Sequence, residues 1–177
     1  MRPFVIGVGG GSSGAGKTTI ACKLLEAFPG WGAIKCTKSS VFGSISDDIA
    51  VLSVQGKDTR RFLDAGAEKV LWVKSDSYDL VEVLRVAIDM LSHLKGVIVE
   101  GNSAIGALKP DAVVFVAGSD GEIKEGAAEV LGLADIVIFD REPPQGAPEF
   151  AKKHRVSEDE DFLTSISEII RRFEDRT

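Results

Sequence analysis

The stretch that most constrains the fold lies near the N-terminus, where an apolar run leads into a glycine-rich segment and then into a helical pattern. Residues 11 to 18 have the spacing of a phosphate-binding loop, which is a glycine, four further residues and then Gly-Lys-Thr. Phe4 to Val8 form the apolar, β-branched run expected of a buried parallel strand. Apolar residues then recur at helical spacing until Pro29 and Gly30, which end the helix. The sequence therefore predicts a strand, a tight loop and a helix in that order.

The residue types of this loop suit the binding of a triphosphate. Glycines let the backbone close around an anion, and successive N–H groups at a helix N-terminus favour negative charge. Lys17 can reach the β- and γ-phosphates, and the Thr18 hydroxyl can join the coordination shell of Mg²⁺. We therefore predict that the loop binds GTP or ATP, with Thr19 donating to the α-phosphate. The loop residues predicted to hold the nucleotide are Gly11, Ser12, Ser13, Gly14, Ala15, Gly16, Lys17, Thr18 and Thr19.

Composition narrows the class of protein to which this loop belongs. The chain has 177 residues, 44% hydrophobic and 27% charged, as expected of one globular domain spanning residues 1–177. The net charge of −6 argues against a nucleic-acid partner, because phosphate contacts need a basic face. No apolar run is long enough for a membrane partner or span, and the first strand leaves no room for a signal peptide. Cys22 and Cys36 match no metal or redox spacing, so buried or half-buried thiols in a reducing cytoplasm are expected.

Strand and helix patterns alternate along the rest of the chain. Residues 31–37 predict a second strand with Lys35 near its carboxyl end, where open α/β sheets bind ligands. Lys35 is thus either a phosphate or substrate contact or a solvated lysine, and its position alone does not decide. Further strands are predicted over residues 70–73, 96–100, 109–118 and 134–141. Helices are predicted over residues 58–66, 79–95, 121–133 and 157–173.

Three local expectations accompany this pattern of strands and helices. Residues 38–57 are polar with scattered apolar residues, and within them residues 49–54 fit a short strand. Asp47 and Asp48 either help to hold a metal or form a solvated loop pair, of which the second is favoured. Asp58 fits the N-cap of the helix that follows it, and Gly66 fits the residue after its end.

A second segment with chemical interest ends at Glu100. Residues 96–100 are a β-branched run that terminates in a carboxylate. In a chain with a phosphate-binding loop, such a carboxylate can hold Mg²⁺ or orient a nucleophilic water. The alternative is a glutamate at a strand end without a chemical role. We predict Thr18 and Glu100 as metal ligands and Lys17 and Glu100 as the catalytic residues.

The alternation of strands and helices predicts an α/β fold of three layers with a mostly parallel central sheet. With the loop after the first strand, this is the pattern of a P-loop NTPase domain. Neither Asn-Lys-x-Asp nor Thr-Lys-x-Asp occurs, so the sequence leaves the base open between guanine and adenine. Asp140 and Arg141 end the last predicted strand, where such folds often contact the base.

Several segments together resemble the MobB family, the adapter proteins of molybdopterin guanine dinucleotide biosynthesis. The resemblance covers roughly the first 105 residues. Beyond the loop, its motifs are Ile34-Lys35-Cys36-Thr37, Gly56-Lys57-Asp58-Thr59, Ala65-Gly66-Ala67 and Val99-Glu100-Gly101. Lys38 and Ser39 stand where the family has paired histidines, and Asn102-Ser103 replace an aromatic residue and a lysine, so the chain resembles a divergent member.

The resemblance implies a homodimeric GTP-binding protein with slow hydrolysis that assists a nucleotidyltransferase partner. In that interpretation Lys35 contacts phosphate or molybdopterin, and residues 38–57 are a natural pairing surface. The alternative on the same fold is an ATP-dependent small-molecule kinase or ligase. Lys35 and Asp58 would then face the acceptor.

Overall fold

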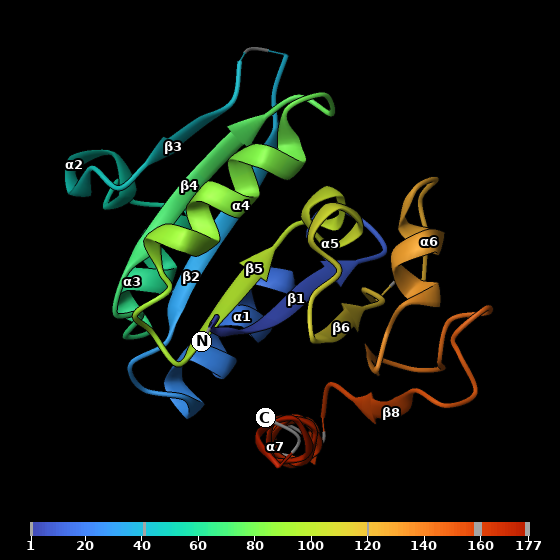
Figure 1. The fold of residues 1–177 in the computed structure, drawn as a ribbon. Helices are drawn as coiled ribbons and strands as arrows, with labels where there is room; N and C mark the ends of the chain where they lie inside the picture. Colours follow the sequence, from blue (N-terminus) through green and yellow to red (C-terminus); the bar gives the residue numbers. More distant parts are fainter. Residues whose placement is uncertain (1, 41, 120, 158–160, 176–177) are drawn as a thin grey trace.

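The computed structural model describes residues 2–40, 42–119, 121–157 and 161–175, and its centre is one sheet (Figure 1). The strands are β1 (Phe4–Gly10), β2 (Gly32–Lys38), β3 (Ser44–Ser46), β4 (Val70–Ser75), β5 (Gly96–Glu100), β6 (Ala112–Val116), β7 (Ile136–Phe139) and β8 (Lys152–Arg155). Within these residues they form an eight-stranded sheet in the order β3-β4-β2-β5-β1-β6-β7-β8. All neighbours pair in parallel except β3, which runs antiparallel to β4 at the edge.

Helices cover both faces of the sheet. They are α1 (Lys17–Ala27), α2 (Ile49–Leu52), α3 (Asp58–Asp64), α4 (Leu80–Met90), α5 (Asn102–Leu108), α6 (Ala127–Gly132) and α7 (Asp161–Glu174). Side chains of α1, α3 and α7 pack with one face of the strands, and those of α4, α5 and α6 pack with the other. The strands between them are buried on both faces, which explains their continuous apolar runs. The predicted α/β fold with three layers and a mostly parallel sheet is confirmed.

Most predicted elements lie where the sequence places them, with shorter ends. The helix predicted over 79–95 is α4 and ends at Met90, and the one predicted over 121–133 begins only at Ala127. The sequence spacing of Asp79 and Glu82 predicts a capping box at the start of α4, but Asp79 makes no side-chain cap bond, so that prediction is wrong. Ser157 and Glu160 have the same spacing, and Glu160 lies outside the described residues.

The region 38–57 contains the main correction to the predicted elements. The strand expected over 49–54 is wrong, because Ile49–Leu52 form the short helix α2. The side chain of Asp48 caps that helix by accepting a hydrogen bond of 2.9 Å from the backbone N–H of Ala50. Asp47 instead pairs with Lys69 at 3.1 Å. Neither carboxylate is therefore placed to hold a metal with the other.

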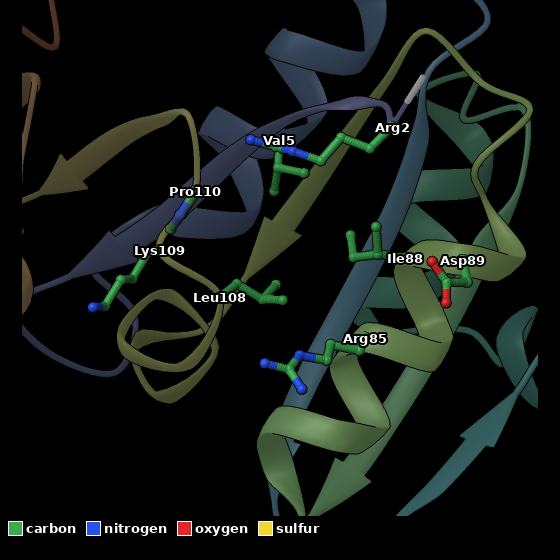
Figure 2. A pocket seen from close by; sticks show the side chains of 8 residues that line it. All are labelled: Arg2, Val5, Arg85, Ile88, Asp89, Leu108, Lys109 and Pro110. Atoms are coloured by element: carbon green, nitrogen blue, oxygen red, sulfur yellow. The ribbon is translucent and has the colours of Figure 1, made fainter.

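A hollow of about 380 Å³ lies on the α4 and α5 side of the sheet, near the start of β1 (Figure 2). Val5, Ile88, Leu108 and Pro110 give it an apolar floor, and charged side chains stand at its rim. The glycine-rich loop follows the opposite end of β1, after Gly10. This hollow is therefore separate from the predicted nucleotide site.

Candidate nucleotide-binding site

The glycine-rich loop connects β1 to α1 and has the backbone that its glycines permit. Gly14 and Gly16 have φ values of 80° and 101°, in the left-handed region that side chains disfavour. Gly16 is also the N-cap residue of α1. At Gly11 a Cβ atom would lie 2.4 Å from the carbonyl oxygen of Glu122, so a larger residue would displace the neighbouring chain. The loop thus makes a tight turn that leads directly into the N-terminus of α1, where backbone N–H groups can bind an anion.

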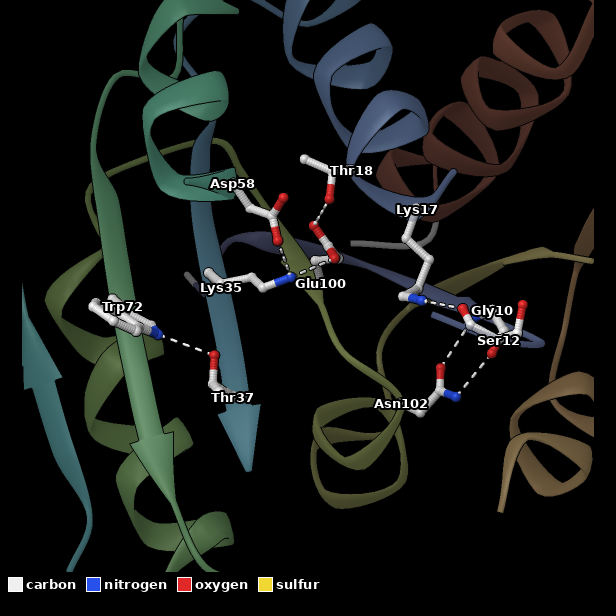
Figure 3. Close-up of polar contacts among 10 residues, drawn as sticks. All are labelled: Gly10, Ser12, Lys17, Thr18, Lys35, Thr37, Asp58, Trp72, Glu100 and Asn102. Carbon is white, nitrogen blue, oxygen red and sulfur yellow. Dashed lines mark hydrogen bonds and ion pairs between the residues drawn. The ribbon is translucent and has the colours of Figure 1, made fainter. Parts of the chain in front are cut away.

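Asn102 anchors the start of the loop. Its Oδ1 accepts a hydrogen bond of 2.9 Å from the backbone N–H of Gly10, and its Nδ2 donates one of 2.9 Å to the carbonyl of the same residue (Figure 3). Asn102 is the first residue of α5, directly after Gly101. Sequence reasoning missed this role, because an asparagine after a strand has many uses and nothing in its spacing points to Gly10.

Lys17 lies over the loop that precedes it. Its Nζ donates a hydrogen bond of 2.8 Å to the carbonyl oxygen of Ser12 (Figure 3). Burial lowers the pKa of this ammonium below its ordinary value, and the nearby charge of Lys35 acts in the same direction. The opposing attraction of Glu100 and Asp58 does not fully compensate. A phosphate beside Lys17 would therefore gain more electrostatic attraction than one beside a lysine that is already paired with a carboxylate.

Four side chains form a connected polar cluster next to the loop. The Thr18 hydroxyl donates to Glu100 Oε2 at 2.9 Å, and Lys35 Nζ donates to Glu100 Oε1 at 2.6 Å. Lys35 Nζ also lies 2.6 Å from Asp58 Oδ2, so one ammonium is shared by two carboxylates (Figure 3). The Glu100 side chain is only 1% exposed, whereas that of Asp58 is 38% exposed. Register explains the contact, since Glu100 on β5 pairs directly with Lys35 on β2.

The charges of this cluster stabilise one another. Burial acts to lower the pKa of Lys35, but the attraction and hydrogen bonds of Glu100 and Asp58 raise it above its ordinary value. Burial acts to raise the pKa of Asp58, and the hydrogen bond and charge of Lys35 hold it below its ordinary value. Lys35 and Asp58 are therefore both ionised near neutral pH.

The cluster and the loop line one hollow of about 410 Å³. The predicted residues that line it are Ser13, Gly14, Gly16, Lys17, Thr18, Thr19, Lys35 and Glu100. Gly11, Ser12 and Ala15 belong to the loop without lining this hollow. Asp58 and Arg61 also line it, and Arg61 donates a hydrogen bond of 3.0 Å to the Thr19 hydroxyl.

Two residues of α3 therefore join the loop and the two strand ends at this site, and the sequence expected Asp58 beside Lys35 only in the kinase or ligase alternative. Asp58 is wrong as the predicted N-cap, because Lys57 holds that position and Asp58 turns its carboxylate to Lys35. Arg61 was missed altogether, because an arginine on a short helix gives no sign of the helix's neighbour. In α3, the contact follows from packing against α1.

The oxygens of Thr18, Glu100 and Asp58 suit Mg²⁺, which prefers oxygen ligands and binds proteins through one or two carboxylates together with substrate phosphates. Among the described residues, no group of three or more His, Cys, Asp and Glu side chains could hold a metal alone.

Comparison with known proteins shows the class of fold. No family model and no curated protein matches the chain. Among solved structures, LpxK from Aquifex aeolicus in complex with ATP aligns with 88% of this chain at 17% identity and a TM-score of 0.52. This chain spans about half of LpxK, covering 53% of its length. A plasmid partition protein from Borrelia burgdorferi aligns over 99% of this chain and 100% of its own, at 12% identity and a TM-score of 0.45.

With its loop, sheet order and likeness to LpxK, the chain has the α/β fold of a P-loop NTPase. The spacing of its loop, from Gly11 to Thr18, is typical of loops that bind the phosphates of a nucleoside triphosphate. In the part of the chain that the structure describes, no helix has the length and apolar character needed to cross a membrane.

Proposed function

We propose that this chain, as a single domain of residues 1–177, binds a nucleoside triphosphate with Mg²⁺ and hydrolyses it slowly. The observation that carries the proposal is the buried cluster of Thr18, Glu100 and Lys35 directly beside the loop. A buried carboxylate, a hydroxyl from the first turn of α1 and a lysine at one hollow supply metal ligands and a countercharge for phosphate.

Each residue has a definite task in this proposal. The loop from Gly11 to Thr19 and Lys35 bind the phosphates, with Lys17 neutralising charge at the β- and γ-phosphates. Thr18 and Glu100 would hold Mg²⁺, which supplies charge neutralisation at the phosphates when bound. Glu100 also orients the water that attacks the γ-phosphate, and it is assigned with Lys17 as the catalytic pair.

We further propose that the nucleotide is GTP and that the protein acts as an adapter of the MobB kind. In that role it would assist a nucleotidyltransferase in assembling molybdopterin guanine dinucleotide. The four motifs shared with the family support this role, and two of them contain Lys35 and Glu100, which meet in the cluster. Both cysteines are free thiols, in keeping with a cytoplasmic location.

A kinase or ligase that uses ATP is the second candidate, favoured by Asp58. Its carboxylate comes from a third element, α3, and reaches the same ammonium as Glu100 while staying 38% exposed. It is therefore accessible to an acceptor beside the nucleotide. Because its pKa is held low by Lys35, Asp58 would position an acceptor hydroxyl rather than take up its proton.

Calorimetry with GTP, ATP and the two diphosphates, each with Mg²⁺ and with or without molybdopterin, tests both candidates. An adapter should bind GTP tightly with little turnover, and a kinase should bind ATP and turn over quickly with an acceptor. ATP preference with indifference to the pterin would remove the MobB interpretation.

Two variants test the site itself. Lys17→Ala should weaken triphosphate binding about tenfold to a hundredfold without unfolding the chain, because one charge-assisted contact is lost. Lys95→Ala removes an exposed lysine just before β5 and serves as the matched control. Glu100→Gln should mainly reduce Mg²⁺-dependent hydrolysis. Unchanged affinity in Lys17→Ala would refute the phosphate site, and unchanged turnover in Glu100→Gln would make Glu100 structural.

We propose that the homodimer expected of a MobB-like protein forms through residues 38–57. Phe42 before β3 is 90% exposed, and Ile49 in α2 and Val54 after it are 62% and 45% exposed. Apolar side chains gathered on one exposed segment favour a protein contact. Sedimentation should show a dimer that dissociates on Phe42→Ser with Ile49→Ser, whereas a monomeric wild type would contradict this surface.

A further inference from the structure

A second hollow, of about 320 Å³, adjoins the nucleotide site. It shares Lys35 and Asp58 with the hollow beside the loop and is otherwise lined by Thr37, Lys57, Thr59 and Trp72. These residues come from β2, from β4 and from the start of α3. Any ligand held here would therefore lie next to the nucleotide.

Strand register brings the side chains of this hollow to one face. Lys35 on β2 pairs with Trp72 on β4, and two residues further on Thr37 pairs with Lys74. Residues two apart on a strand point to the same side, so all four face the layer that contains α1 and α3. Trp72 donates a hydrogen bond of 3.0 Å from Nε1 to the Thr37 hydroxyl (Figure 3).

Two ammonium groups lie over the indole ring of Trp72. Lys74 Nζ lies 3.8 Å and Lys57 Nζ 5.4 Å from the ring centroid. Neither forms an ion pair with a carboxylate among the residues that the structure describes. The ring face offsets part of their charge, but two like charges drawn to one ring leave a net positive field. The sharing of one ring by these two lysines thus favours an anion bound near Trp72.

The remaining polar groups of the hollow add a donor rather than an acceptor. Since the Thr37 oxygen accepts from Trp72, its own hydrogen is left for a further acceptor. The Thr59 hydroxyl is buried and already donates to the carbonyl of Leu52 at 2.8 Å. Asp58 is the single carboxylate in the lining, and it stands at the Lys35 side. The far side of the hollow therefore presents the Lys57 ammonium and one hydroxyl donor, and Lys74 lies outside the lining, over the ring of Trp72.

We propose that this hollow binds the phosphate group of a small phosphomonoester, the second ligand of the nucleotide-dependent function proposed above, on which this inference rests. Lys57 and Lys74 supply the countercharge, and Thr37 donates to a phosphate oxygen. A phosphomonoester carries about two negative charges at neutral pH, which matches two unpaired ammoniums better than a single carboxylate does. The protein's donors, Thr37, Lys57 and Lys74, come from three separate segments, which suits a tetrahedral anion better than a planar one.

Because Lys35 and Asp58 line both hollows, the rest of the phosphomonoester would extend toward the nucleotide site. Lys35 is already neutralised by two carboxylates. Binding in the second hollow therefore depends on Lys57 and Lys74, while binding in the first depends on Lys17. This separation makes the two sites testable one at a time.

The experiment uses the full chain with Trp31→Phe, which leaves Trp72 as its only tryptophan. A non-hydrolysable GTP or ATP analogue with Mg²⁺, whichever binds, fills the loop, and glycerol 3-phosphate, inorganic phosphate and acetate are then titrated separately. Trp72 fluorescence and calorimetry should show saturable binding of glycerol 3-phosphate in the millimolar range, with acetate far weaker. Lys57→Gln and Lys74→Gln should each weaken it about tenfold, since each removes one charge-assisted contact. Lys95→Gln is the charge-matched control and should not change it.

Saturable binding of the ester that weakens about tenfold in each lysine variant and is unchanged in the Lys95→Gln control supports the inference. It is overturned by no saturable binding of the ester, by wild-type affinity in Lys57→Gln and Lys74→Gln, or by acetate binding as tight as that of the ester. Binding of inorganic phosphate without the ester overturns the phosphomonoester assignment. Affinity for the nucleotide analogue is measured in the same variants. If the wild type does not bind the nucleotide analogue, the proposed function is refuted. If it binds the analogue but not the ester, only the second site is refuted.

Discussion

Removal of the Lys35 ammonium should lower the free energy of unfolding, and the burial of its two carboxylate partners sets how much is lost. Lys35→Met keeps most of the side-chain volume but leaves Glu100, which is 1% exposed, with the Thr18 hydroxyl and no cation. Losing one partner of a buried ion pair costs about 3–5 kcal/mol. Lys35 itself is 19% exposed and Thr18 still donates to Glu100, so the low end, about 3 kcal/mol, is expected. The Asp58 side of the bridge adds under about 1 kcal/mol, because that carboxylate is 38% exposed.

Urea unfolding of a small variant set measures these terms. Lys35→Met with Glu100→Gln should recover most of the loss, because the buried charge and its partner are then both absent. Asp58→Asn should cost under about 1 kcal/mol. Arg85→Met breaks the exposed pair with Glu82, whose side chains are 66% and 74% exposed, and controls for loss of a surface cation. If Lys35→Met loses no more than Arg85→Met, or if the double variant loses the sum of the singles, the reasoning is refuted.

The same variants have a defined pH dependence. The pKa of Lys35 is raised above its ordinary value of 10.5, so its stabilisation is complete below pH 10.5 and is lost as the pH rises through the folded pKa. The pKa of Asp58 is lowered from its ordinary value of 3.8, so its smaller contribution is present above pH 3.8 and is lost as the pH falls through the folded pKa. Lys35→Met should therefore lack the alkaline loss of stability that the wild type shows, which urea titrations from pH 9 upward would detect.

Two further predictions concern the loop anchor and the thiols. Asn102→Ala leaves the N–H and carbonyl of Gly10 without their partner, so it should cost about 1–3 kcal/mol in urea unfolding and weaken nucleotide binding in calorimetry. Affinity equal to the wild type would show that the anchor does not shape the loop. Burial raises the pKa of Cys36 to about 11 and also raises that of the less buried Cys22, so both should react slowly with iodoacetamide at pH 8. Mass spectrometry should find Cys22 alkylated first, and Cys36 reacting first would contradict the burial.

The fold was predictable where one physical requirement dominates a segment. Strands buried on both faces need unbroken apolar runs, and β1, β5 and β6 have them. Strand β8 was not predictable, because Lys152–Arg155 are mostly exposed, charged residues at the sheet edge and carry no such pattern. The prediction of a strand where α2 forms was wrong for a different reason. Four apolar residues suit either a strand or a helical turn, and the cap from Asp48 decides between them.

The site was predictable to the extent that it follows strand ends. Glu100 and Lys35 meet because parallel strands end at one edge and β5 lies next to β2. The contact of Lys35 with Asp58 depends instead on how α3 packs against α1 and β2, which short motifs do not encode. The same holds for Arg61. Sequence spacing thus locates the phosphate loop and its acidic neighbour. The residues that α3 contributes, Asp58 and Arg61, can be placed at the site only once the tertiary packing is known.

One row of the sheet explains how two hollows can operate side by side. Val8, Glu100, Lys35 and Trp72 pair in turn across β1, β5, β2 and β4. Lys35 lies in the middle of this row, so an anion in either hollow competes for the same ammonium with Glu100 and Asp58. If both ligands relied on it, each would weaken the other by the same factor. In the proposed second site, Lys57 in the lining and Lys74 over the Trp72 ring would remove that conflict, because their charge would leave Lys35 to the nucleotide.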